Sequence, residues 1–127
     1  MKISNEQVNA DSLANMAIDA VHLLRSGDFS RLADRYGYAL ASGRPVSVAI
    51  AEDLSACLST LQATGLSDSA SSLPPKVTFF KENDTGLFAL VESWVQATNG
   101  QELLVELIVT AQGEDKWVTL EDLSTSS

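Results

Sequence analysis

Apolar residues in the first part of the chain recur at intervals of three and four, the spacing that places side chains on one face of an α-helix. The first apolar stripe consists of Leu13, Met16, Ala17, Ala20, Val21 and Leu24. Ser4 and Gln7 could form a capping box before this stripe, and Asp11 or Ser12 is a later start. Because a glycine after the last apolar position is typical of a helix end, we expect the helix to stop at Gly27.

Two further helices are expected before residue 64. Asp28 or Ser30 can cap the second helix, which we expect to stop at Gly43. The third helix is expected over residues 47–63. The apolar positions of these two helices are Phe29, Leu32, Ala33, Tyr36 and Leu40, and then Ile50, Leu54, Cys57, Leu58 and Leu61. The first half of the chain therefore predicts three helices.

The second half of the chain predicts strands. Residues 64–76, TGLSDSASSLPPK, are rich in serine and contain two adjacent prolines, which predicts an exposed and mobile loop. The four stretches that follow, separated by turn-like residues, are KVTFF, LFALVESWVQA, ELLVELIVTA and KWVTLEDL. Three N-terminal helices packed on a curved four-stranded antiparallel meander make an α+β fold. A length of 127 residues fits a single domain over residues 1–127.

The turn at Asn99 and Gly100 decides how the two central strands pair. A two-residue type I′ turn places Thr98 opposite Gln101, and every further pair of facing residues follows from that one. Glu92 then faces Leu107, on the sheet face that the helices must cover. That predicted core face also contains Gln96, and its apolar members are Phe88, Leu90, Trp94, Leu103, Val105, Leu107, Val109, Val118 and Leu120.

The opposite face of the predicted sheet mixes apolar and acidic side chains. A turn around Gly113 and Glu114 places Glu106 directly opposite Glu121. Like charges in such positions cost up to about 1 kcal/mol, so folding stability gives no reason for them. Acidic side chains around an aromatic anchor are typical of protein interfaces, and the alternative is that the N-terminal segment or a second subunit covers this face. The candidate partner-binding residues are Glu102, Leu104, Glu106, Ile108, Trp117 and Glu121.

Negative charge concentrates in the predicted sheet. The formal net charge is −9. Residues 1–81 carry 8 acidic and 7 basic side chains, whereas residues 82–127 carry 9 acidic side chains and only Lys116. This field repels phosphate backbones and anionic lipid, so we expect no nucleic-acid or membrane binding, and it attracts a basic macromolecule. Solubility is the alternative explanation of the charge.

Few residues offer catalytic or metal chemistry. Glu92, desolvated on the predicted core face, is a candidate general base, and the alternative is a carboxylate paired with Arg31 or Arg35. A general base needs an electrophilic partner, and nothing in the sequence places one beside it. A single histidine, His22, and a single cysteine, Cys57, argue against a zinc site, and no motif for a cofactor is present. With no export signal or membrane-spanning run, we expect a cytoplasmic protein.

The order of elements resembles the ketosteroid-isomerase-like cone fold, which is shared with nuclear transport factor 2 and SnoaL-type proteins. The resemblance lies in HLLRSGDFSRLA, in the hairpin LFALVESWVQATNGQELLVELIV and in the terminal KWVTLEDL strand. It implies a sheet wrapped around helices, often with a pocket, which would allow an enzyme or ligand binder that uses Glu92. The acidic chain also resembles immunity proteins of contact-dependent growth inhibition systems. That second resemblance implies binding of a basic, nuclease-type toxin domain, and we prefer this hypothesis to the enzyme.

Overall fold

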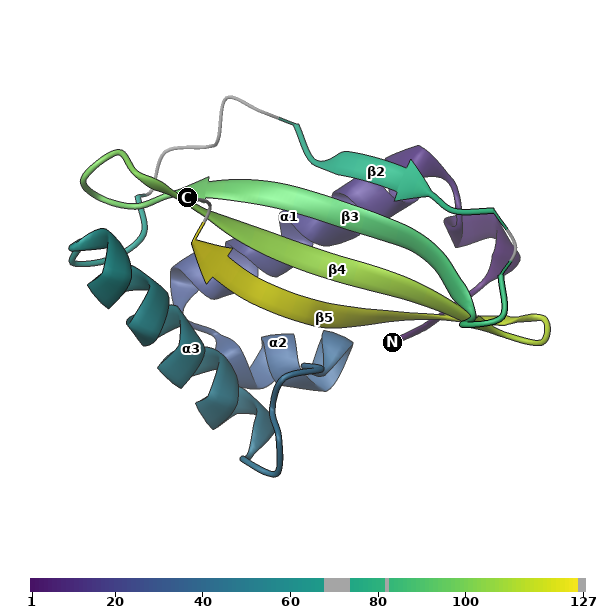
Figure 1. Cartoon of the computed structure of the whole chain (residues 1–127), viewed down its shortest axis with the longest axis horizontal. Helices are drawn as coiled ribbons and strands as arrows, with labels where there is room; N and C mark the ends of the chain where they lie inside the picture. Colours follow the sequence, from purple (N-terminus) through teal and green to yellow (C-terminus); the bar gives the residue numbers. More distant parts are fainter. Residues whose placement is uncertain (68–73, 82, 126–127) are drawn as a thin grey trace.

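The computed structural model describes residues 1–67, 74–81 and 83–125 and has the predicted α+β class, with three helices and an antiparallel sheet (Figure 1). The helices are α1 (Ala10–Ser26), α2 (Phe29–Tyr36) and α3 (Val46–Leu61), preceded by the short 3-10 helix η1 (Asn5–Gln7). The strands are β1 (Lys2–Ile3), β2 (Lys76–Phe79), β3 (Leu87–Gln96), β4 (Glu102–Gln112) and β5 (Asp115–Thr125). The sheet order is β1-β5-β4-β3-β2. The four expected strands form the meander, and β1 is a fifth strand that was not predicted.

Helix α1 ends where the sequence predicts and begins at a residue that was not considered. Its cap is Asn9, whose side-chain oxygen accepts a hydrogen bond from the backbone N–H of Ser12 at 2.8 Å. Ser4 instead caps η1, where its N–H donates to the side chain of Gln7. At the other end Gly27 has φ 74°, the left-handed conformation that glycine adopts without strain.

Helix α2 is shorter than predicted. The Asp28 side chain caps it as expected, but it ends at Gly37 rather than Gly43. Beyond Gly37 the backbone turns toward the sheet, where the N–H of Ala39 donates to the carbonyl of Leu120 at 2.9 Å. Leu40, expected on the apolar face of this helix, is 43% exposed in the loop that follows.

The turn between β3 and β4 contains three residues instead of two. The N–H of Ala97 donates to the carbonyl of Gln101 at 2.7 Å, which closes the turn around residues 98–100. Within this turn only Gly100 has a positive φ, 86°, so it is not a type I′ turn. The Asn99 side chain donates to the carbonyl of Leu61 at 2.9 Å and thereby ties the turn to the end of α3.

This extra residue shifts the strand pairing by one position, so the predicted register was wrong. Glu92 faces Glu106 instead of Leu107, and Trp94 faces Leu104. A one-residue shift turns a strand over, because successive side chains point to opposite faces. The buried side chains of β3 are Ala89, Val91, Ser93 and Val95, while Leu90, Glu92, Trp94 and Gln96 point the other way. Phe88 lies at a bulge and packs against the core.

The pairing of β4 with β5 follows the prediction for half of its length. From the turn to the pair Leu107–Leu120 the register is the expected one. A bulge then shifts it, so that Glu106 faces Asp122 and not Glu121. The predicted core residues of these two strands are buried: Leu103, Val105, Leu107, Val109, Val118 and Leu120.

The helices pack on one face of the sheet. Figure 1 shows α1 behind β3 and β4, and α2 and α3 alongside β5. The buried side chains form one hydrophobic cluster to which all three helices and strands β1, β3, β4 and β5 contribute. Within the described ranges no helix is long and apolar enough to cross a membrane. Of the predicted loop over residues 64–76, residues 68–73 lie outside the described chain, and Leu66 forms a bridge with Ala97.

Candidate functional site

The sheet has an outer face, which we define as the side of β3, β4 and β5 turned away from the helices. None of the described elements packs over it, and Figure 1 shows the near side of β3 and β4 without a covering helix. The strand register places on it Leu90, Glu92, Trp94, Gln96, Glu102, Leu104, Glu106, Ile108, Thr110, Trp117, Thr119 and Asp122. Apart from the exposed Trp117, these side chains are half-buried. The outer face is therefore a mixed apolar and acidic surface that no described helix covers.

Cross-strand pairs on β3 and β4 alternate in character along this face. A pair of carboxylates lies between two apolar pairs, which we call the apolar rungs. In order along the strands the pairs are Trp94 with Leu104, Glu92 with Glu106, and Leu90 with Ile108. Directly facing side chains in a sheet touch, so the two carboxylates are close to each other and have apolar neighbours on both sides.

The carboxylates continue across the sheet onto β5. Glu106, on the middle strand, faces Glu92 on one side and Asp122 on the other, and we call these three residues the carboxylate row. Lys76 on β2 faces Glu92 at the end of the row. Among the described residues the ion pairs involve Asp19, Asp28, Asp53 and Asp115, and none involves the carboxylate row.

The environment of Glu106 disfavours its charged form. Burial raises the pKa of Glu106 above its usual range, and the charges of Asp122, Glu92 and Glu121 raise it further. A positive charge placed on the carboxylate row would relieve this repulsion. Since no group of three or more His, Cys, Asp or Glu side chains within the described ranges is placed to hold a metal ion, we do not assign the row to a metal.

The predicted partner-binding residues fall into two groups in the structure. Leu104, Glu106 and Ile108 lie in and beside the carboxylate row, as predicted for β4. Glu102 faces Gln96 near the β3–β4 turn, and Glu121 lies at the bulge of β5. Trp117 is 38% exposed and faces Thr110, four residues along β4 from Glu106, and the Lys2 ammonium lies 6.0 Å from the centre of its ring.

Five residues of the outer face were not expected there from the sequence, namely Leu90, Glu92, Trp94, Gln96 and Asp122. The signal that could have found the first four is that alternate positions of β3 differ in polarity. The set from Ala89 to Ala97 contains no charge, whereas the set from Leu90 to Gln96 contains a glutamate and a glutamine. The uncharged set is the one that the helices cover, although its side chains are smaller.

The predicted position of Glu92 on the core face was wrong, and its role as a catalytic carboxylate stays a prediction. Glu92 lies on the outer face, on the opposite side of the sheet from the helices. The alternative partners Arg31 and Arg35 pair instead with Asp28 and Asp19. Glu92 is therefore outside the helix-covered core where the sequence placed it, and among the ion pairs of the described residues none joins it to an arginine.

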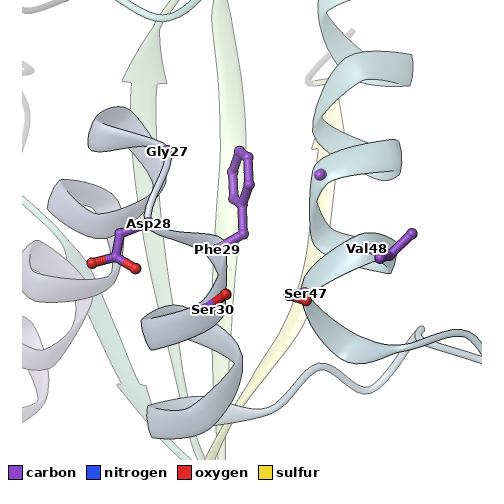
Figure 2. Close-up of a pocket in the computed structure, with 7 residues that line it drawn as sticks. Gly27, Asp28, Phe29, Ser30, Ser47 and Val48 are labelled. Atoms are coloured by element: carbon purple, nitrogen blue, oxygen red, sulfur yellow. The ribbon is translucent and has the colours of Figure 1, made fainter.

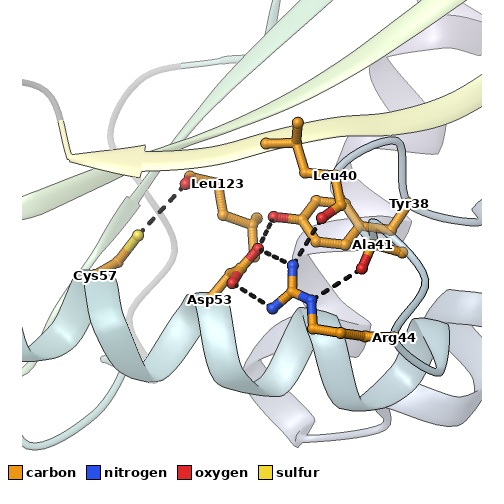
Figure 3. Close-up of polar contacts among 7 residues, drawn as sticks. All are labelled: Tyr38, Leu40, Ala41, Arg44, Asp53, Cys57 and Leu123. Atoms are coloured by element: carbon orange, nitrogen blue, oxygen red, sulfur yellow. Dashed lines mark hydrogen bonds and ion pairs between the residues drawn. The ribbon is translucent and has the colours of Figure 1, made fainter.

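A second polar cluster lies at the loop before α3 and is structural. Arg44 donates to both carboxylate oxygens of Asp53 at 2.9 and 3.2 Å, and the Tyr38 hydroxyl donates to Asp53 at 2.5 Å (Figure 3). Arg44 also donates to the backbone carbonyls of Ala41 and Leu40. The hydrogen bonds of Arg44 and Tyr38 lower the pKa of Asp53. Because these groups bind one another, the cluster holds the loop against α3.

Two of the hollows that described residues line lie among the helices. One, of about 280 Å³, lies where the starts of α2 and α3 approach each other (Figure 2), and its lining residues are Gly27, Asp28, Phe29, Ser30, Ser47, Val48 and Ala51. The Asp28 carboxylate in it already accepts the N–H of Arg31. The other, of about 350 Å³, contains the Asp19–Arg35 ion pair and Tyr36. The charged groups of both hollows are occupied by contacts within the protein, so the outer face is the stronger candidate.

Comparison with known proteins adds no assignment. No family model, curated protein or solved structure matches the chain. The argument about function therefore depends on the outer face.

Proposed function

We propose that this is an interaction protein whose outer face binds a basic protein, and specifically an immunity protein that neutralises a cationic, nuclease-type toxin domain. The observation that supports the proposal is the carboxylate row, which lies between apolar rungs on an uncovered sheet face and has no ion-pair partner in the described chain.

The carboxylate row has a cost for folding. Facing carboxylates repel each other, by a few tenths to about 1 kcal/mol for each pair. A partner with basic side chains compensates for that cost on binding, while the apolar rungs become buried in the interface. Desolvated aromatic and aliphatic anchors surrounded by charges are typical of tight protein interfaces.

The charge of the whole chain favours a basic partner. With a net charge of −9, the protein attracts cationic surfaces from a distance and associates with them faster. Nucleases are basic where they hold phosphates, and an acidic protein that covers such a surface blocks access of the substrate. The resemblance to immunity proteins agrees with this chemistry. The cone-fold resemblance stays a hypothesis about the fold.

A rescue experiment tests the proposal. The protein is co-expressed with a candidate cationic, nuclease-type toxin domain, and survival of the cells is measured. We expect rescue by the wild type and none by the double variant Glu106→Lys/Asp122→Lys, which reverses the charge of the carboxylate row. The matched control, Asp34→Lys/Glu52→Lys, makes the same change of net charge at exposed helical positions and should rescue. Equal survival with both double variants, or no rescue by the wild type, would contradict the proposal.

A further inference from the structure

The distance between neighbouring side chains on the outer face determines which basic side chain of a partner fits there. Alternate residues of one strand lie about 7 Å apart, because each residue advances the strand by about 3.3 Å. The apolar rung of Trp94 and Leu104 is therefore one such step from the pair Glu92 and Glu106. A side chain with an apolar stem and a charged head can cover both at once.

We propose that the outer face takes arginine side chains of its partner in preference to lysine, with the stem on an apolar rung and the guanidinium between the carboxylates of the row. This inference rests on the proposed function and names the partner chemistry of the same face.

Arginine fits the outer face better than lysine because the carboxylates have apolar neighbours. A cation that contacts the carboxylates between the two apolar rungs must lose part of its hydration water. A guanidinium is weakly hydrated and planar, binds a carboxylate with two parallel hydrogen bonds, and stacks on an aromatic ring such as that of Trp94. An ammonium group is strongly hydrated and has no flat surface. The burial that raises the pKa of Glu106 is the same desolvation that a lysine tolerates poorly.

A second copy of the chain does not fit this face. In a symmetric dimer the same surface patch contacts itself, so the carboxylate row of one copy would approach that of the other. The row has three acidic residues and only Lys76 at its end. A partner of opposite charge is therefore the occupant that the face favours.

Labelled deca-arginine and deca-lysine peptides, which have equal charge, test the inference. Their dissociation constants are measured by fluorescence anisotropy at pH 7 and low ionic strength. We expect the wild type to bind deca-arginine about tenfold more tightly. Trp94→Ala should remove most of that preference. The matched control, Ile18→Ala, which deletes an exposed apolar side chain on α1, outside the outer face, should retain it.

A second pair of variants tests the carboxylate row by substitutions that remove one charge and nearly keep the shape of the side chain, so that the fold is retained. Glu106→Gln should weaken deca-arginine binding by about fivefold or more, since it removes a carboxylate from the row. Glu114→Gln removes the same charge from the β4–β5 turn and should change affinity less than about twofold. Equal affinity for both peptides, or a preference that neither Trp94→Ala nor Glu106→Gln reduces, would overturn the inference and leave the proposed function standing. No binding of either peptide by the wild type would contradict both.

Discussion

At the scale of single residues, the structure contains side chains whose environment opposes folding. Glu106 is a carboxylate among carboxylates, and Ser93 has a buried hydroxyl that lacks a hydrogen-bond partner in the described chain. Both lie on β3 and β4, the central pair of the sheet. Replacing either side chain by one of similar size that lacks the unfavourable group should stabilise the free protein. A gain in stability would show that the native side chain does not serve folding.

The first prediction concerns Glu106. Its pKa is raised in the folded protein, so its favourable contribution is present below the unfolded pKa and is lost as the pH rises through the folded value. Glu106→Gln should therefore be more stable than the wild type at pH 7, by about 0.5 kcal/mol, and should lose this advantage near pH 4. Urea denaturation at pH 4, 5.5 and 7 measures the difference. A variant that is less stable than the wild type at pH 7 would show that Glu106 has a stabilising partner.

The second prediction concerns Ser93, which is 5% exposed on the core side of β3. A buried hydroxyl without a partner loses its hydrogen bonds to water and gains none in return. Ser93→Ala should raise the free energy of unfolding by about 1 kcal/mol. The same denaturation experiment at pH 7 measures it. Under the register expected from the sequence, Ser93 would point to solvent and the substitution would have almost no effect, so a neutral result would contradict the observed pairing.

At the scale of elements, the sequence predicts the helices better than the strand register. The end of α1 at Gly27 and the approximate extent of α3 follow from apolar periodicity and glycine placement, which are local signals, whereas the start of α1 after Asn9 was not predicted. The early end of α2 was missed because Leu40, four residues after Tyr36, continues the apolar pattern, whereas Tyr38 lies in the loop and donates a hydrogen bond to Asp53. Loop geometry of that kind depends on contacts with α3, which a local pattern does not contain.

The register of β3 was missed for a different reason. Each of its faces contains large apolar side chains. The alternation of side chains along the strand therefore does not decide which face is buried. The dipeptide Asn99-Gly100 fits both a two-residue and a three-residue turn. The length of the turn depends on the hydrogen bond from Asn99 to the end of α3, which is a tertiary contact.

Two glycines at the ends of these strands give the third prediction. Gly86 and Gly100 both have a positive φ, of 74° and 86°. An added Cβ at Gly86 would lie 2.9 Å from the backbone oxygen of Ala111, whereas at Gly100 it would meet nothing within 4 Å. Gly100→Ala should therefore cost about 1 kcal/mol from backbone strain alone, and Gly86→Ala clearly more. Thermal melts of the two variants compare them. A larger loss for Gly100→Ala would contradict the turn geometry.

At the scale of the whole molecule, the charge asymmetry was visible in the sequence, and the arrangement of the charges was not. The sequence predicts an acidic sheet and places Leu104, Glu106 and Ile108 on its open face. It does not predict the carboxylate row, because that row depends on two register shifts, one at the β3–β4 turn and one at the bulge of β5. The central claim is that this outer face, and not the helical side, is where the partner binds.

Methyl-group nuclear magnetic resonance tests that claim most directly, with a candidate basic, nuclease-type domain added to the labelled protein. Leu90, Leu104 and Ile108 supply methyl probes on the outer face. Ile18 on α1 and Val48 on α3, 54% and 46% exposed, supply matched probes on the helical side. We predict that the three outer-face signals shift on binding and that those of Ile18 and Val48 do not. Shifts confined to Ile18 and Val48 would contradict the account.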